Sequence, residues 1–314
     1  MTMPQQQRNE HQAVMLREVM ELWPTDADGF YIDGTFGRGG HSRALLNWLG
    51  PDGLLIGIDR DPQAVESGRQ LAADDGRFRI MASRFDCLTT LVAEVGRPLS
   101  GVLLDLGVSS PQLDDPARGF SFLRDGPLDM RMDPTSGESA AEWLQRAGQT
   151  EIADVLFRYG EEKKSRRIAR LICERREQQP LRTTGELARL IEQAIGRGEP
   201  GKHAATRSFQ AIRIFINQEL QALETVLEQA LECLAPGGRL VVISFHSLED
   251  RIVKLFIRDH SGRAPKLRGG LPAANAKPVQ LAPLGKARRA DEQEIRDNPR
   301  ARSAVLRVAE KVAA

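Results

Sequence analysis

The chain has 314 residues, of which 41% are hydrophobic, so it can bury one large core or two modest ones. It contains no run of about 18 apolar residues, so no membrane-spanning helix is predicted. Its first ten residues are polar, so no signal peptide is predicted. We therefore expect a globular, cytoplasmic protein. The three cysteines, Cys87, Cys173 and Cys233, lack metal-ligand spacing, so we expect free thiols and no metal site.

The net charge is only +1, but its distribution along the sequence is uneven. Residues 158–182 carry nine Lys/Arg against four Asp/Glu, and residues 251–314 carry fifteen against six, so these segments sum to +14 and the remainder to −13. Two basic regions on a nearly neutral protein indicate a polyanionic partner, because Lys and Arg contact phosphates. For the first segment, a solvated helix face with i,i+4 ion pairs remains the alternative.

Near the N-terminus, a short apolar run, 30–32, leads to Asp33 and then to four glycines within seven residues. A helical segment is expected to begin near Ser42. Glycines allow positive φ and close approach of the backbone, and the N-terminus of a helix offers unpaired N–H groups. This pattern predicts a nucleotide-type cradle, with an ordinary tight turn as the alternative.

The next elements alternate between strands and helices. Apolar runs at 54–58, 78–82 and 101–105 are typical of buried parallel strands, and helices are expected at 62–71 and 88–95. Asp61 followed by Pro62 predicts the N-terminus of the first of these helices. An open α/β sheet binds ligands at the carboxyl ends of its strands, so one edge is expected to gather Asp33, Asp59, Phe85 and Asp105.

About 130 residues separate the fourth strand from the next credible one, at 239–245, far more than a crossover needs. The interval predicts a loop at 109–137 and helices at about 139–147, 150–159, 163–177, 184–195 and 206–234, with a capping box at Thr183 and Glu186. We expect an inserted helical domain at 113–216 within a discontinuous domain of residues 1–112 and 217–314. Residues 261–290 are predicted to form a mobile basic loop, and 302–309 a final edge strand.

Three kinds of ligand are candidates for the cradle: a nucleotide bound by a Walker A motif, the dinucleotide NAD, and S-adenosylmethionine. No Walker A motif follows the first strand, and Ser42 stands where a dinucleotide fingerprint needs glycine or alanine. A carboxylate at position 33 would repel a pyrophosphate but suits a cationic ligand, and Asp59 is placed to accept hydrogen bonds from ribose hydroxyls. S-adenosylmethionine, which carries a sulfonium and an ammonium, fits this acidic edge better than NAD.

Long motifs throughout the chain carry a family resemblance. They are Tyr31–Ser42, Ile58–Pro62, Leu103–Asp115, Arg118–Phe122, Gly126–Pro134, Ala205–Arg213, Ala235–Leu240, Ser244–Arg251 and Asn298–Ser303. The sequence resembles the bacterial 16S ribosomal RNA cytosine-N4 methyltransferases of the RsmH or MraW type. The resemblance implies a class I, Rossmann-like methyltransferase domain with an inserted helical domain for substrate recognition. It also implies methylation of a cytidine in the decoding centre of the small ribosomal subunit.

The resemblance further implies the residues of the site. The family's cofactor contacts correspond to Gly39, Gly40, His41, Asp59, Phe85, Asp105 and Gln112. Many amino-methyltransferases carry an Asp/Asn-Pro-Pro-Tyr/Phe motif after the fourth strand, whereas this chain has Asp105-Leu-Gly-Val. The group that accepts the proton is therefore left open among three candidates, in this order: Asp105, Ser109 in the Ser109-Ser110 loop, and His246.

Two other functions are compatible with the sequence. One is an amino-methyltransferase that acts on another amine, such as a protein glutamine or a small metabolite. The other is a non-catalytic RNA-binding assembly factor that keeps a vestigial cofactor fold. The basic segments favour a large anionic substrate, 16S rRNA or the small ribosomal subunit, and the chain is compatible with a homodimer.

Overall fold

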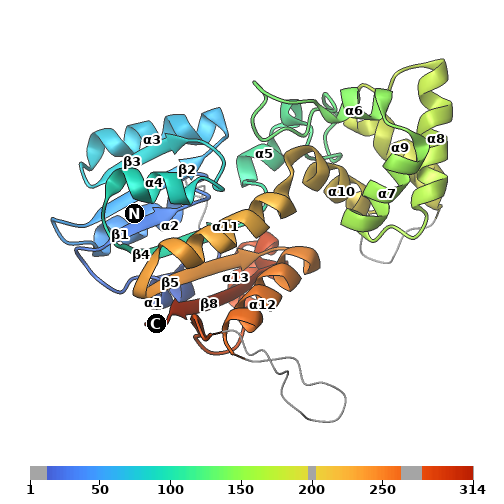
Figure 1. Cartoon of the computed structure of the whole chain (residues 1–314). Helices are drawn as coiled ribbons and strands as arrows, with labels where there is room; N and C mark the ends of the chain where they lie inside the picture. Colours follow the sequence, from blue (N-terminus) through green and yellow to red (C-terminus); the bar gives the residue numbers. More distant parts are fainter. Residues whose placement is uncertain (1–12, 197–202, 263–277, 314) are drawn as a thin grey trace, which may run out of the picture. The chain divides into compact units, whose positions relative to one another are not determined.

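The computed structural model describes residues 13–196, 203–262 and 278–313. These form two compact units: a sheet unit, which contains the described residues up to Gly107 and from Gln221 onward, and a helical unit, Val108–Leu220. The helical unit begins five residues before the insertion expected from the sequence and ends four residues after it. Figure 1 colours it green to yellow.

The sheet unit is built on eight strands. They are β1 (Phe30–Asp33), β2 (Leu54–Asp59), β3 (Phe78–Ala82), β4 (Leu99–Asp105), β5 (Leu234–Ser244), β6 (Leu281–Pro283), β7 (Arg288–Arg289) and β8 (Val305–Lys311). The order is β3-β2-β1-β4-β5-β8-β6, with β7 also paired to β8, and the first five strands are parallel. The predicted fold class is confirmed: an α/β, Rossmann-like class I sheet interrupted by helices.

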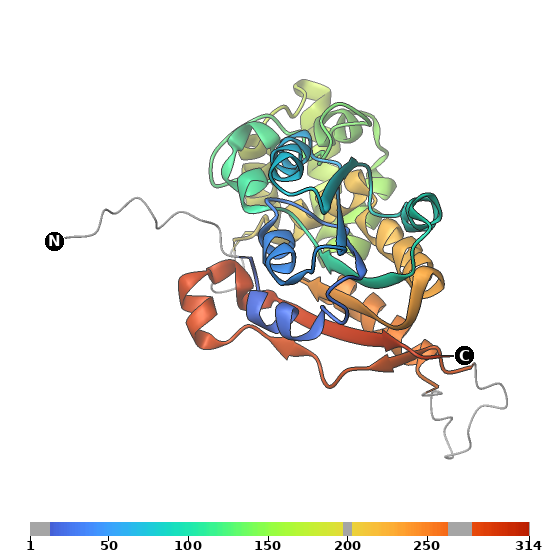
Figure 2. The same ribbon diagram turned by 90° about the vertical axis from the view of Figure 1, so that its left-hand side faces the viewer.

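Side chains alternate between the two faces of the sheet, as the period of a strand requires. Ile32 and Ile56 pack on the side of α4 (Leu88–Val95), α11 (Glu219–Cys233) and α12 (Ser247–His260). Tyr31 and Leu55 pack on the side of α1 (Leu16–Leu22), α2 (Gly40–Trp48) and α3 (Pro62–Asp74). Figure 2 shows α1 beside β8, so segments from the two ends of the described chain share one core.

The sequence predicted that the last strand would lie at the edge of the sheet, and this prediction is wrong. β8 pairs antiparallel with β5 on one side and with β6 and β7 on the other. Part of the segment 261–290, which was expected to be a mobile loop, forms β6 and β7. Leu281 is fully buried and anchors β6 against the core. Residues 263–277 lie outside the described part. Between β7 and β8 the chain forms α13 (Glu292–Asp297) and η3 (Pro299–Ser303).

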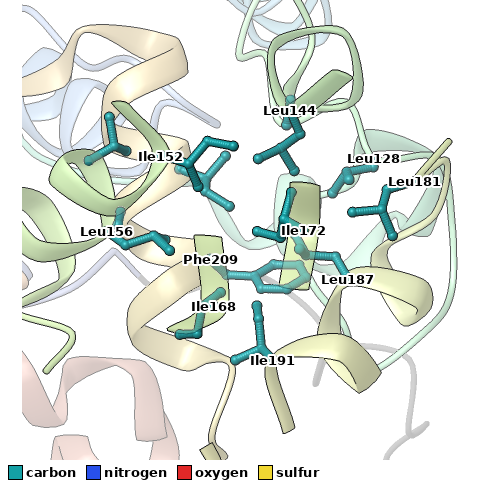
Figure 3. Close-up of a cluster of buried hydrophobic side chains, with 14 of the residues drawn as sticks. Leu128, Leu144, Ile152, Leu156, Ile168, Ile172, Leu181, Leu187, Ile191 and Phe209 are labelled. Atoms are coloured by element: carbon teal, nitrogen blue, oxygen red, sulfur yellow. The ribbon is translucent and has the colours of Figure 1, made fainter. Parts of the chain in front are cut away.

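The helical unit contains α5 (Ser110–Asp114), η2 (Pro116–Arg118), α6 (Ala140–Arg146), α7 (Gln149–Gly160), α8 (Ser165–Gln178), α9 (Thr184–Ile195) and α10 (Thr206–Asn217). Its apolar side chains meet in one cluster, in which Ile168, Ile172 and Phe209 lie together (Figure 3). The predicted capping box of α9 is confirmed, since the Glu186 N–H donates to Thr183 Oγ1 at 3.3 Å. The predicted helix 206–234 is instead two helices, because Gln218 adopts φ +52° between α10 and α11.

Within the described part of the chain, no helix combines the length and the apolar character needed to cross a membrane.

Candidate active site

The glycine-rich loop after β1 is fixed to both neighbouring strands. The Gly34 N–H donates to Leu103 O at 2.9 Å, and the Phe36 N–H donates to Ile58 O at 3.0 Å. Thr35 Oγ1 accepts a hydrogen bond from the Asp105 N–H at 2.6 Å. β1 lies between β2 and β4, where the strand order reverses, and such switch points are where open α/β sheets bind ligands.

Two glycines of the loop have backbone conformations that other residues rarely adopt. Gly37 and Gly39 have φ +56° and +74°, and a Cβ on Gly39 would lie 2.7 Å from the Phe36 ring. Gly39 is the N-cap of α2, which begins at Gly40, two residues earlier than expected. Gly40 and His41 therefore belong to the first turn, whose N–H groups have no intrahelical partner and are suited to an anionic group.

The buried side chain of Asp33 makes hydrogen bonds within the protein. Its side chain is 1% exposed, Oδ2 accepts from the Ser42 hydroxyl at 2.7 Å, and Oδ1 accepts from the Thr35 N–H at 3.2 Å. Burial raises the pKa of Asp33 to about 6, although both hydrogen bonds and the nearby His41 oppose the shift. The carboxylate thus ties the start of α2 to the end of β1. Because the side chain is enclosed, the hydrogen bonds of Asp33 in this structure are to the loop and to α2, and its suitability for a cationic ligand stays a prediction.

Asp59, at the end of β2, organises the opposite side of the loop. Its Oδ2 accepts from the Gly37 N–H at 2.8 Å, and its Oδ1 accepts from the Asp61 N–H at 2.9 Å. Burial raises the pKa of this carboxyl group, and the backbone donors of Asp61, Gly37 and Arg60 oppose the shift. Each carboxylate oxygen can accept a second hydrogen bond, so Asp59 can also bind ligand hydroxyls. Asp61 caps α3 as predicted, accepting from the Gln63 N–H.

His41 and Asp105 form the centre of the candidate site. His41 Nε2 lies 3.7 Å from Asp105 Oδ2, and the histidine ring is almost fully buried. Among the described residues, neither ring nitrogen of His41 nor Asp105 Oδ1 has a hydrogen-bond partner, although all three atoms are buried. A buried polar atom without a partner costs about 1–3 kcal/mol. Such atoms at a sheet switch point indicate a ligand site.

The other predicted cofactor contacts divide between the two units. Phe85 lies in the sheet unit after β3, with its Cβ 3.3 Å from the Cβ that a side chain at Gly34 would have. Gln112 lies in the helical unit. Its side chain accepts from the Ser109 N–H at 2.9 Å, in a capping box at the start of α5. Ser109 and Gln112 thus stabilise each other at a helix terminus.

His246 caps α12. Its Nδ1 accepts from the Glu249 N–H at 3.3 Å, and its Nε2 lies 3.0 Å from Glu249 Oε1. The buried Glu249 in turn accepts from the Phe245 N–H at 2.8 Å. Both ring nitrogens therefore face one neighbouring residue, an arrangement that ties His246 to the start of the helix.

A third group beside the glycine loop, Glu294, could not be predicted from the sequence. The Met15 N–H donates to Glu294 Oε1 at 2.6 Å, and Met15 is fully buried with φ +54°. Two residues earlier, Ala13 lies so close to Gly40 that a Cβ there would be 2.8 Å from the Ala13 Cβ. Burial raises the pKa of Glu294, while the Met15 N–H and His41 are among the groups that oppose this shift. Glu294 thus holds the segment that packs on the first turn of α2.

Comparison with known proteins identifies the family. Residues 8–312 match the MraW methylase family. The chain belongs to this family. It is 68% identical to the ribosomal RNA small subunit methyltransferase H of Alcanivorax borkumensis, over 96% of this chain and 97% of the relative. It is 57% identical to the protein of the same name from Chromohalobacter salexigens, over 96% of this chain and 92% of the relative. The predicted family and enzyme class, a methyltransferase of the MraW type, are confirmed.

The predicted cofactor of this MraW methylase, S-adenosylmethionine, fits the described residues. The cradle cannot accept a side chain at Gly39, and it presents the N-terminus of α2 beside the unpartnered nitrogens of His41. On the other side of the loop, Asp59 keeps acceptor capacity for hydroxyl groups. The site thus combines donors for a carboxylate with an acceptor for ribose hydroxyls, two of the polar groups of this methyl donor.

Proposed function

We propose that this protein transfers a methyl group from S-adenosylmethionine to the exocyclic N4 of a cytidine in the decoding centre of 16S rRNA. The small-subunit rRNA substrate is supported by the names of the relatives, which are 55–68% identical to this chain. The site of modification and the N4 position come from the motif resemblance. The reaction would take place in the cytoplasm, on free RNA or on the small ribosomal subunit.

The observation that carries the proposal is the group of buried, unpartnered polar atoms of His41 and Asp105 at the switch point. We assign the N–H groups of Gly40 and His41 to the carboxylate of the methionine moiety. Gly39, whose own N–H donates to Phe36 O at 2.8 Å, would contribute by leaving room for the ligand. Asp59 would accept from the ribose hydroxyls, and Phe85 and Gln112 are the further cofactor contacts that the resemblance implies. The bound cofactor would supply an electrophilic methyl group on sulfur.

Positioning is expected to provide most of the rate, because methyl transfer requires in-line approach of the amine. The N4 lone pair is delocalised into the cytosine ring, and an acceptor for an N4 proton would localise it. In the reaction a bond forms between N4 and the methyl carbon, the bond from that carbon to sulfur breaks, and N4 releases one proton. We assign the acceptor to Asp105, because it ends β4 and its Oδ1 has no hydrogen-bond partner among the described residues. Ser109 instead lies in a helix cap, and His246 Nε2, which also has no hydrogen-bond partner, lies 3.0 Å from Glu249 Oε1.

The test is to incubate the protein with isotopically labelled S-adenosylmethionine and, separately, free 16S rRNA or small ribosomal subunits. Mass spectrometry of the digested RNA should locate the label on N4 of one cytidine. Label on an adenine or on protein would refute the substrate assignment. Calorimetric titration with S-adenosylmethionine distinguishes the enzyme from a non-catalytic RNA-binding factor, which would show no binding.

A further inference from the structure

Helix α8, in the helical unit, has two contrasting faces. Ser165, Ile168, Ala169 and Ile172 are buried, and Figure 3 shows Ile168 and Ile172 within the apolar cluster. At 100° per residue the opposite face begins just before the helix and carries the basic stripe, which we define as Lys163, Arg166, Arg167 and Arg170. All four side chains of the basic stripe are exposed.

Acidic side chains near the basic stripe leave most of its charge unpaired. Among the described residues, the ion pairs include one for Arg170, with Glu174 at 3.5 Å, and none for Lys163, Arg166 or Arg167. The preceding Glu162 is buried, and its Oε1 accepts from the Lys164 N–H at 2.9 Å. This carboxylate is therefore occupied by the backbone at the start of the helix.

The placement of the basic stripe works against the stability of α8. Four pairs of its members are three or four residues apart, a spacing at which like charges on a helix repel. They also lie in the first half of the helix, where the macrodipole disfavours cations, and the first turn contains no acidic residue. A local arrangement that opposes helix formation indicates a function elsewhere.

The remaining arginines of α8 contrast with the stripe. Arg176 Nη1 donates to Leu144 O and Ala147 O, both at 2.6 Å, and so satisfies carbonyls at the C-terminal end of α6. Arg175 donates to Gln179 O at 3.0 Å. These side chains bind groups of the protein itself, as arginines near a helix C-terminus often do. At the other end of α8, Arg166 and Arg167 have no ion pair among the described residues, so their donors are available to a partner.

We propose that the basic stripe of α8 is a contact surface for the phosphate backbone of the RNA substrate. This inference rests on the proposed function. Exposed guanidinium groups bind phosphates with two parallel hydrogen bonds, and successive turns of one helix face can follow a phosphate backbone. Such contacts hold the RNA without reading its sequence. The stripe thus contributes affinity and orientation.

The test compares the wild type with Arg166→Gln/Arg167→Gln, using a 16S rRNA transcript at several salt concentrations. The slope of log affinity against log salt should decrease by about 1.4–1.8, from roughly 0.7–0.9 for each lost phosphate contact. The KM for RNA should rise on the order of tenfold at moderate salt, because two phosphate contacts are lost. The kcat and the affinity for S-adenosylmethionine should stay within about twofold, and Tm should not fall, since charge repulsion in α8 is relieved.

The matched control is Arg69→Gln/Arg146→Gln, which also removes two exposed positive charges, each already paired with a carboxylate. Its salt slope should equal that of the wild type. An unchanged slope in the α8 variant, or equal slopes in both variants, would overturn the inference. So would a fall in Tm with unchanged RNA affinity, which would give the stripe a structural role. Failure of the wild type to methylate or bind the RNA would instead refute the proposed function on which the inference rests.

Discussion

The buried carboxylate of Asp33 makes a quantitative prediction about stability. Its pKa is raised by burial from 3.8 to about 6, so the folded protein binds its proton more tightly than the unfolded chain. Stability therefore falls as the pH rises through this window, and the shift corresponds to about 3 kcal/mol at about 1.36 kcal/mol per pKa unit. The cost is absent below about pH 4 and fully present above about pH 6. Asp33→Asn removes the titration but retains a side chain that can hydrogen-bond Ser42.

The measurement is urea-induced unfolding of the wild type and Asp33→Asn between pH 4 and 8. The difference in unfolding free energy should move in favour of the variant by about 3 kcal/mol across this range, with most of the change between pH 4 and 6. Ser42→Ala removes a donor that lowers the pKa of Asp33, so it should move the window to higher pH. A difference between the wild type and Asp33→Asn that does not depend on pH would refute this account of Asp33.

Four further predictions concern the candidate site. Gly39→Ala should weaken S-adenosylmethionine binding at least tenfold in calorimetry, because φ +74° and the Phe36 ring leave no room for a Cβ; unchanged affinity would contradict the cradle. Glu294→Ala should raise the KM for S-adenosylmethionine about tenfold with little change in kcat, through loss of a charge-assisted bond to Met15. Glu294→Gln, which keeps an acceptor, should restore most of this loss, and equal KM values for all three proteins would refute the role of Glu294. Asp105→Asn should lower kcat about 100-fold or more in single-turnover assays. His246→Gln should mainly cost stability, by about 1 kcal/mol, and the opposite pattern would make His246 the acceptor.

The sequence could predict the sheet because buried parallel strands are short, continuous apolar runs. Asp59 and Asp105 stand at the ends of β2 and β4, as expected, since a strand that leaves the core ends in a polar residue. The long interval after β4 could only contain an insertion, because a crossover needs far fewer residues. Such features depend on local composition and spacing, which a single sequence displays.

Features that depend on contacts between distant residues could not be predicted in this way. Residues 15 and 294 are 279 positions apart, and nothing local indicates that the Met15 N–H needs Glu294. The pairing of β6 with β8 similarly turns a strand expected at the edge into an interior one. The break at Gln218 was missed because the apolar stripe continues across it, and a single left-handed residue leaves little trace in a periodic pattern.

The catalytic candidates show how a cap can resemble an active site in sequence. Ser109-x-x-Gln112 and His246-x-x-Glu249 both match the spacing of a capping box, with a polar side chain at the N-cap and an acceptor three residues later. The capping role accounts for the residues of each pair without a substrate. The His41-Asp105 pair has no such explanation, because its members come from α2 and β4 and meet only in the folded sheet unit.

Among the acidic side chains at this sheet edge, hydrogen bonding therefore distinguishes those that shape the glycine loop from Asp105, whose Oδ1 has no partner among the described residues. Asp33, Asp59 and Glu294 each accept hydrogen bonds from backbone or side-chain groups that shape the glycine loop and its surroundings. Their position fixes where the first turn of α2 presents His41. Asp105 is joined to the same loop only through its backbone N–H, which leaves one carboxylate oxygen uncommitted. An uncommitted acceptor on a rigid strand end is the group best placed to receive a proton without disturbing the loop that holds the methyl donor.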